Sequence, residues 1–154
     1  MSSDTIIRPA SLDDLEQIVE FNRRMAAETE HKTLSLDVLG RGVRAVLTDA
    51  AVGRYFVACR DEQVIGQLLL TLEWSDWRNG QIWWIQSVYV RPEHRQSGVF
   101  RMLYTHVEEL ARATPGVVGL RLYVEQANLA AQQTYKKLGM RPTGYLVFET
   151  LWVD

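Results

Sequence analysis

Residues 88–103 constrain the fold more than any other part of the chain. They read VYVRPEHRQSGVFRML, in which a strand-like run passes through a short polar loop directly into an amphipathic helix. The loop contains Arg95, Gln96, Ser97 and Gly98. The first turn of a helix has backbone N–H groups without intrahelical partners, and it carries the positive end of the helix dipole. The junction therefore predicts a binding site for a phosphate or pyrophosphate.

The length and composition are those of one globular domain over residues 1–154. With 154 residues, 47% of them hydrophobic and 23% charged, the chain can bury a core. The formal net charge of −2 provides no basic field for a nucleic acid, so the arginines near the loop favour a small anionic ligand. There is no apolar run long enough for a membrane span, no secretory-type segment, and no disulfide partner for the single cysteine, Cys59. We therefore expect a cytoplasmic protein without a nucleic-acid or membrane partner.

Changes of hydrophobic period along the chain predict its secondary structure. Alternating or continuous apolar runs predict strands over residues 5–8, 54–59, 63–73, 81–90, 120–124 and 145–152. Helical spacing predicts helices over residues 12–25, 36–47, 100–111 and 129–138. Ser11 and Asn128 are placed to cap the first and last of these helices. The resulting order, β-α-α-β-β-β-α-β-α-β, indicates the α/β class.

The middle of the chain predicts how the sheet is built. Asn79-Gly80 favours a hairpin, so residues 81–90 should run antiparallel to residues 63–73. Both faces of residues 81–90 are largely apolar, as in a strand covered on both sides. We therefore expect a mixed, mostly antiparallel central sheet flanked by helices, with residues 81–90 in its interior.

Two segments resemble the signature regions of a known family. VYVRPEHRQSGVFRMLY and the later NLAAQQTYKKLGM resemble the two motifs of the GNAT superfamily of acetyl-CoA-dependent N-acetyltransferases. In that family a strand leads into R/Q-x-x-G-x-G/A and a helix; later, an Asn precedes a helix that bears Tyr ahead of a Leu-Gly-Phe/Met ending. The resemblance covers the C-terminal half closely, and the element order of the N-terminal half agrees with it. It implies a single GNAT domain that uses acetyl-CoA.

The resemblance implies a set of cofactor-binding residues. Backbone groups of one strand end would pair with the pantetheine arm, and the N–H groups of the loop and first helical turn would hold the pyrophosphate. Arg95 stands at the first motif position and Gly98 at the fixed glycine. The implied cofactor-binding residues are Val88, Tyr89, Val90, Arg95, Gln96, Ser97, Gly98, Val99, Phe100, Arg101 and Asn128.

Three of the implied residues also have ordinary structural interpretations. Phe100 departs from the family's Gly or Ala. Either its ring turns into the core with Leu103 and Val107, which we expect, or the cofactor sits differently. Asn128 is foremost a helix cap, with or without a ligand contact. The resemblance implies that Tyr135 is the catalytic general acid that protonates the leaving CoA thiolate. Alternatively, Tyr135 is a half-buried core residue on the helix face of Ala131 and Leu138.

The general base is less evident than the acid. Trp84 stands where some family members have a glutamate. Glu73 and Glu125, at strand ends, could act through water, or they are surface charges. Cys59 lies well before the motif and is not expected to be a nucleophile. No His or Cys spacing indicates a metal site, so we expect none.

Three function classes follow. The first is an N-acetyltransferase that acts directly on an amine of a small molecule or peptide. The second is a non-catalytic CoA-binding sensor or regulator of the same fold, suggested by Phe100 and the missing glutamate. The third is a nucleotide-binding module, which lacks the expected G-x-x-x-x-G-K-[ST] motif. A homodimer is a further expectation from the aromatic-rich strands and the resemblance.

Overall fold

The computed structural model describes residues 4–153, which divide into two units between Leu122 and Tyr123. In the first unit the strands are β1 (Ile6–Pro9), β2 (Arg54–Arg60), β3 (Gln63–Ser75), β4 (Gly80–Val90) and β5 (Val117–Leu122). Its helices are α1 (Leu15–Glu30), α2 (Leu36–Thr48) and α3 (Val99–Ala113), with short 3-10 turns η1 (Leu12–Asp14), η2 (Asp76–Arg78) and η3 (Pro92–His94). The second unit contains α4 (Leu129–Lys137).

The sheet has the mixed topology expected from the sequence. Its order is β1-β2-β3-β4-β5, with antiparallel pairing from β1 to β4 and a parallel pair between β4 and β5. The hairpin prediction for β3 and β4 is confirmed, and β4 has a neighbour on each side. A parallel neighbour needs a crossover connection, which α3 supplies. The α/β class with a mostly antiparallel sheet is therefore confirmed.

One predicted strand is wrong. Residues 145–152 form neither strand nor helix in the structure. Their apolar and β-branched residues have the composition of a strand, but a strand also requires a partner for its backbone groups. Composition cannot supply that partner.

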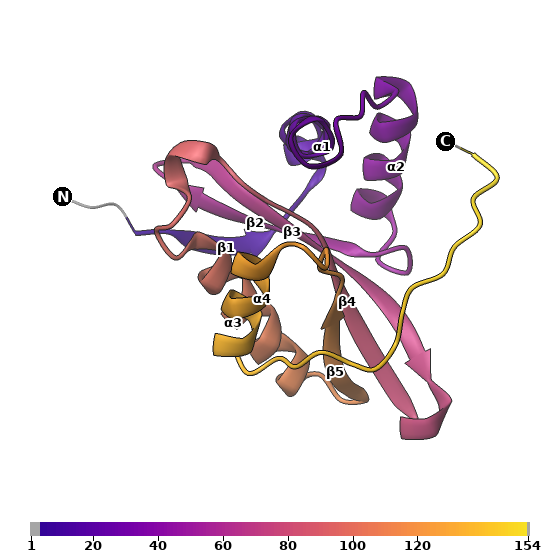
Figure 1. Ribbon diagram of the computed structural model, residues 1–154. Coiled ribbons are helices and arrows are strands. Elements are labelled where there is room, and N and C mark those ends of the chain that lie inside the picture. The colour runs from indigo at the N-terminus through magenta and orange to yellow at the C-terminus, as the bar shows by residue number, and fades with distance from the viewer. Residues whose placement is uncertain (1–3, 154) are drawn as a thin grey trace. The chain divides into compact units, whose positions relative to one another are not determined.

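Helices cover both faces of the sheet in the first unit. Helices α1 and α2 lie on one face and α3 lies on the other (Figure 1). The buried side of α3 is formed by Val99, Leu103, Val107 and Ala111, spaced four residues apart. The ring of His106 on α3 contacts Phe56 of β2, with 5.4 Å between ring centroids. The end of β4 is thus fixed between two helical layers.

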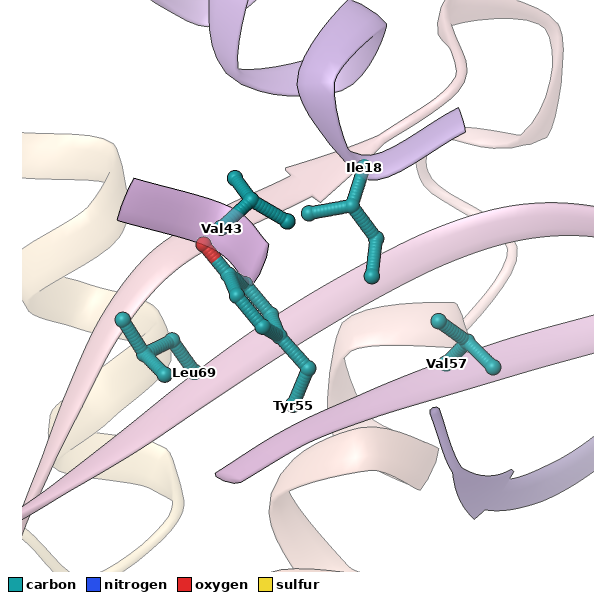
Figure 2. Close-up of a cluster of buried hydrophobic side chains, with 5 residues drawn as sticks. All are labelled: Ile18, Val43, Tyr55, Val57 and Leu69. Atoms are coloured by element: carbon teal, nitrogen blue, oxygen red, sulfur yellow. The ribbon is translucent and has the colours of Figure 1, made fainter. Parts of the chain in front are cut away.

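The core between the sheet and α1 and α2 is largely apolar, and the hydroxyl of Tyr55 is buried within it. Figure 2 shows Ile18 of α1, Val43 of α2 and Leu69 of β3 around the ring of Tyr55, whose hydroxyl points toward the helices. Tyr55 is 6% exposed, and Asn22 of α1 donates a hydrogen bond from Nδ2 to its hydroxyl oxygen at 3.3 Å. The hydroxyl is therefore satisfied inside the core, as a buried polar group requires.

The start of α1 is held by a buried carboxylate. Ser11 caps η1, which continues into α1, and the backbone N–H of Ser11 donates to Asp14 Oδ2 at 2.8 Å. Arg8 of β1 donates two hydrogen bonds to the same carboxylate, at 2.8 and 2.9 Å. These hydrogen bonds from Arg8 hold the pKa of Asp14 below its ordinary value of 3.8. The capping box thus ties the first helix to the edge strand.

Replacing Asp14 by asparagine should lower the free energy of unfolding at pH 7 by about 1–2 kcal/mol, the usual scale for a lost cap and a charge-assisted bond. Because the folded-state pKa is the lower one, the contribution of Asp14 is present above pH 3.8 and is lost as the pH falls through the folded-state pKa. Urea unfolding at pH 7, 5 and 3 should therefore give a difference between wild type and variant that narrows on acidification. A constant difference would contradict this assignment.

Candidate functional site

The loop between β4 and α3 has the geometry of an anion cradle. Gln96 and Gly98 both have left-handed backbone conformations, with φ of 61° and 84°. Gly98 is the N-cap of α3, and in the described chain no side chain caps this helix start. The side chains of Ser11, Ser35 and Asn128, by contrast, cap the starts of η1, α2 and α4. The first-turn N–H groups of α3 are therefore left for solvent or an anion.

The loop is anchored to the far end of α1. Arg95 donates from Nε to the carbonyl of Val90 and from Nη2 to Glu28 Oε2, each at 2.9 Å. Its guanidinium lies over the ring of Tyr89, 5.2 Å from the centroid, and the Tyr89 hydroxyl donates to Glu28 Oε1 at 3.2 Å. The hydrogen bond from Arg95 lowers the pKa of Glu28, which stays ionised near neutral pH. Arg95 thus shapes the loop through its own protein contacts.

Sequence reasoning missed Glu28, whose neighbourhood has the composition of a solvated helix end. It is separated from its partner Arg95 by 67 positions, and no local periodicity connects two residues so distant.

The arginines near the loop have different roles. Arg91 donates to the carbonyl of Val64 at 2.8 Å and to Gln17 at 2.7 Å, and it lies over the ring of Phe21. Arg91 therefore joins β3, β4 and α1. Arg101 is exposed and lines a cavity of about 560 Å³ together with Ser97, Gly98 and residues of β1 and α3. Among the three arginines, Arg101 is the one that shares a cavity with the loop residues Ser97 and Gly98.

The expectation for Phe100 is wrong. The buried stripe of α3 begins at Val99, which is 2% exposed, and Phe100 is only half-buried. The ring of Phe100 lies against Tyr104, with 6.2 Å between centroids. The buried stripe of α3 runs through Val99 and Leu103, and Phe100 stands about 100° around the helix from Val99, at the edge of that stripe.

The end of β4 extends beyond its parallel neighbour. The ladder with β5 runs from Gln81 opposite Val117 to Ile85 opposite Leu122, so residues 86–90 lie past its end. The register between β3 and β4 shifts near this end. Gln67 pairs with Tyr89, and Leu69 pairs with Gln86. Two residues of β4, Ser87 and Val88, therefore face the single residue Leu68 of β3. This is a β-bulge, and Ser87 has a φ of 48° within it. Val88, Tyr89 and Val90 therefore form a strand end with one edge beyond the ladder.

The second unit contains the remaining predicted site residues. Asn128 accepts a hydrogen bond from the N–H of Ala131 at 3.1 Å, so its role as a helix cap is confirmed. Tyr135 lies on α4 about one turn after Ala131. Burial raises the pKa of Tyr135, so its phenol is protonated throughout the neutral range.

Glu73, one of the two candidates for the general base, is paired with another side chain. Glu73 forms an ion pair with Arg121 of β5 and lies opposite Ile82 of β4. Ile82 is six residues from Val88, roughly 20 Å at the usual rise of a strand. The ion pair and this separation favour the surface-charge interpretation of Glu73 over the role of a base acting through water.

Within residues 4–153 there is no group of three or more His, Cys, Asp or Glu side chains that could hold a metal ion. The same residues include no helix with the length and apolar character needed to cross a membrane.

The fold and the cradle define an α/β protein with an anion-binding helix start, and comparison with known families assigns the class. A family model described as "Acetyltransferase (GNAT) family" matches residues 14–140. The chain belongs to this family. The match extends over both units.

Solved structures agree with the family. A possible acetyltransferase from Clostridium difficile 630 is 43% identical, with 97% of this chain and 99% of that chain covered and a TM-score of 0.90. A transcriptional regulator from Bacillus halodurans C-125 is 20% identical, with 96% and 100% covered and a TM-score of 0.82. A predicted acetyltransferase with acetyl-CoA from Clostridium acetobutylicum is 16% identical, with 96% of each chain covered and a TM-score of 0.79. The last two show likeness of fold alone. The search among curated proteins finds no match.

Proposed function

We propose that the protein is an N-acetyltransferase that moves an acetyl group from acetyl-CoA directly to an amine of a small molecule or peptide. One observation carries the proposal: β4 extends past the β5 ladder and continues through residues 91–98 into the uncapped start of α3. An extended amide chain can pair with the first feature, and a pyrophosphate can accept hydrogen bonds at the second. Both are needed to bind CoA. The 154 residues act as one domain in this proposal, in accord with the family match across both units.

The chain has backbone groups suited to each part of the cofactor. Val88, Tyr89 and Val90 supply the strand edge for the pantetheine amides. The pyrophosphate is held by N–H groups from Gln96 to Arg101, where the left-handed Gly98 lets the backbone approach phosphate oxygens. The exposed side chain of Arg101 adds positive charge there.

The chemistry is acyl transfer without a covalent enzyme intermediate. The amine nitrogen forms a bond to the thioester carbonyl carbon, the C–S bond breaks, and the amine gives up a proton to water. The N–H of Val88 is the proposed donor to the oxyanion that develops on the carbonyl. Tyr135 gives its proton to the departing thiolate and regains a proton from water. Burial raises the pKa of Tyr135, so the phenol still carries its proton at neutral pH when the thiolate leaves.

Acetyl-CoA should raise the melting temperature of the purified protein in the presence of EDTA. A ligand at about 100 times its Kd stabilises a native protein by about 2.7 kcal/mol, which corresponds to a shift of roughly 5–10 °C for a chain of this size. Differential scanning fluorimetry and calorimetric titration measure the effect. An unchanged melting temperature together with no heat of binding, at saturating CoA and acetyl-CoA, would overturn the proposed function.

A turnover assay distinguishes the acetyltransferase from the alternative, a non-catalytic CoA-binding sensor. The fold likeness to a transcriptional regulator is the reason to test that alternative. CoA release can be followed with a thiol reagent against polyamines, amino acids, aminoglycosides and peptide N-termini. Turnover with one amine class supports the enzyme. Tight binding without turnover across the panel favours the sensor. Displacement of CoA by ATP would instead indicate a nucleotide-binding module.

A further inference from the structure

A buried glutamine lies directly beside the bulge in β4. Gln67 of β3 has no exposed surface and donates a hydrogen bond from Nε2 to the carbonyl oxygen of Ser87 at 3.0 Å. This bond fixes the orientation of the amide, because a carbonyl oxygen can only accept. The other end of the amide, Oε1, is buried and has no hydrogen-bond partner among the described residues.

An apolar side chain would pack at this position without leaving an acceptor unsatisfied. The neighbours Ile65, Leu68 and Leu69 on β3 are buried and apolar. A buried polar atom without a partner lowers the stability of the fold, so stability alone does not explain a glutamine at this position. The hydrogen bond that Gln67 donates must therefore have a further role.

Ser87 is held from a second direction as well. Its side chain interacts with the hydroxyl of Tyr55, which also accepts the hydrogen bond from Asn22 of α1. Asn22 in turn donates to the carbonyl of Ile18 at 3.0 Å. A short polar chain thus runs from α1 through β2 to the bulge, within an otherwise apolar layer. It fixes a serine in a backbone conformation that serine rarely adopts.

The geometry of the peptide bond connects Gln67 to the reaction. The carbonyl of Ser87 and the N–H of Val88 belong to one planar peptide unit and point in opposite directions. A donor that fixes the direction of the Ser87 carbonyl therefore fixes the direction in which the N–H of Val88 points. A hydrogen bond to the carbonyl also polarises the unit and strengthens its N–H as a donor.

We propose that Gln67 is a positioning residue, which holds the Ser87–Val88 peptide so that the N–H of Val88 is directed at the oxyanion of acetyl transfer. The inference rests on the proposed function, because it assigns a task to Gln67 only where acetyl transfer occurs. Gln67 acts through the peptide unit and does not itself contact the substrate.

The first test is Gln67→Met, which preserves the length of the side chain and removes its donor. The kcat for acetyl transfer should fall roughly ten- to a hundredfold, somewhat less than for complete loss of an oxyanion donor, while the KM for acetyl-CoA stays within about twofold. Ile65→Val is the matched control, since Ile65 is equally buried two residues earlier on β3. Its kcat should equal that of wild type at a temperature where both variants are folded.

The second test is Gln67→Glu, which also applies if the methionine variant does not fold. A protonated carboxyl can donate to the Ser87 carbonyl, whereas an ionised one repels it. The ratio of variant kcat to wild-type kcat should therefore fall as the pH rises from 5 to 8. The cross-strand neighbours that titrate are Tyr55 and Tyr89, whose pKa values are raised by burial, and Arg24 and Glu28 of α1 lie next to Tyr89. All four keep their charge states over this range.

The outcomes separate the two proposals. A wild-type protein that neither binds acetyl-CoA nor releases CoA overturns the proposed function before any variant is made. An active wild type with an unchanged kcat in Gln67→Met overturns the positioning role. A pH dependence of kcat in Gln67→Glu that parallels that of wild type also overturns it. The positioning role is overturned as well if kcat falls as much in Ile65→Val as in Gln67→Met.

Discussion

Replacing Tyr135 by phenylalanine should reduce turnover by roughly ten- to a thousandfold, while the affinity for acetyl-CoA changes little. The substitution keeps the ring on α4 and deletes only the hydroxyl that would protonate the leaving thiolate. Burial raises the pKa of Tyr135, so the wild-type phenol retains its proton at the pH of the assay. Steady-state kinetics with an identified amine, with calorimetric titration of acetyl-CoA, measure the two quantities separately.

Tyr145→Phe is the matched control, because Tyr145 is 77% exposed and belongs to the same unit as Tyr135. Its turnover should equal that of wild type. Full activity in Tyr135→Phe would return Tyr135 to the role of a packing residue and leave the leaving group to be protonated by water.

Replacing Gly98 by proline should weaken acetyl-CoA binding by roughly ten- to a hundredfold. Gly98 has a φ of 84°, which proline cannot adopt, and proline also removes one N–H from the cradle. Loss of one charge-assisted hydrogen bond costs about 1.5–3 kcal/mol, which corresponds to that range. Calorimetric titration measures the affinity directly.

Alanine substitutions provide a matched pair for this prediction. Gly98 and Gly116 have nearly equal φ values of 84° and 83°, and a Cβ at either would meet nothing within 4 Å. Both substitutions therefore introduce the same kind of backbone strain, but Gly116 lies after the other end of α3. Gly98→Ala should lower acetyl-CoA affinity and Gly116→Ala should not. Equal losses of affinity would contradict a specific role for the loop.

Local signals in the sequence predicted most of the elements. The Asn79-Gly80 dipeptide marked the hairpin, and Ser11 and Asn128 marked helix starts, because turns and caps depend on residues close together in the chain. The strand over residues 145–152 was wrong because its existence depends on a distant partner. The burial of Phe100 was overestimated because helical spacing does not show which of two adjacent apolar residues, Val99 or Phe100, lies at the centre of the buried stripe.

The site was only partly accessible to sequence reasoning for the same physical reason. The cradle follows from neighbouring residues, whereas the Glu28–Arg95 ion pair and the Gln67–Ser87 hydrogen bond join separate elements. A bulge depends on sheet register, which the alternation of side chains does not reveal. A glutamine within the apolar run of β3 was the one visible indication of the polar chain behind β4.

The mixed pairing of β4 has a consequence for the order in which the molecule assembles. Strands β2, β3 and β4 follow one another through short turns, so their contacts are local and should form early and rapidly. Strand β5 can pair with β4 only after α3 has crossed the sheet, which makes that parallel contact the more distant and slower one. On the ribosome, the meander of residues 54–90 emerges before the loop and helix that complete the cradle. A nascent chain therefore acquires its strand platform before it can bind an anion, and ligand can stabilise only the later folding steps.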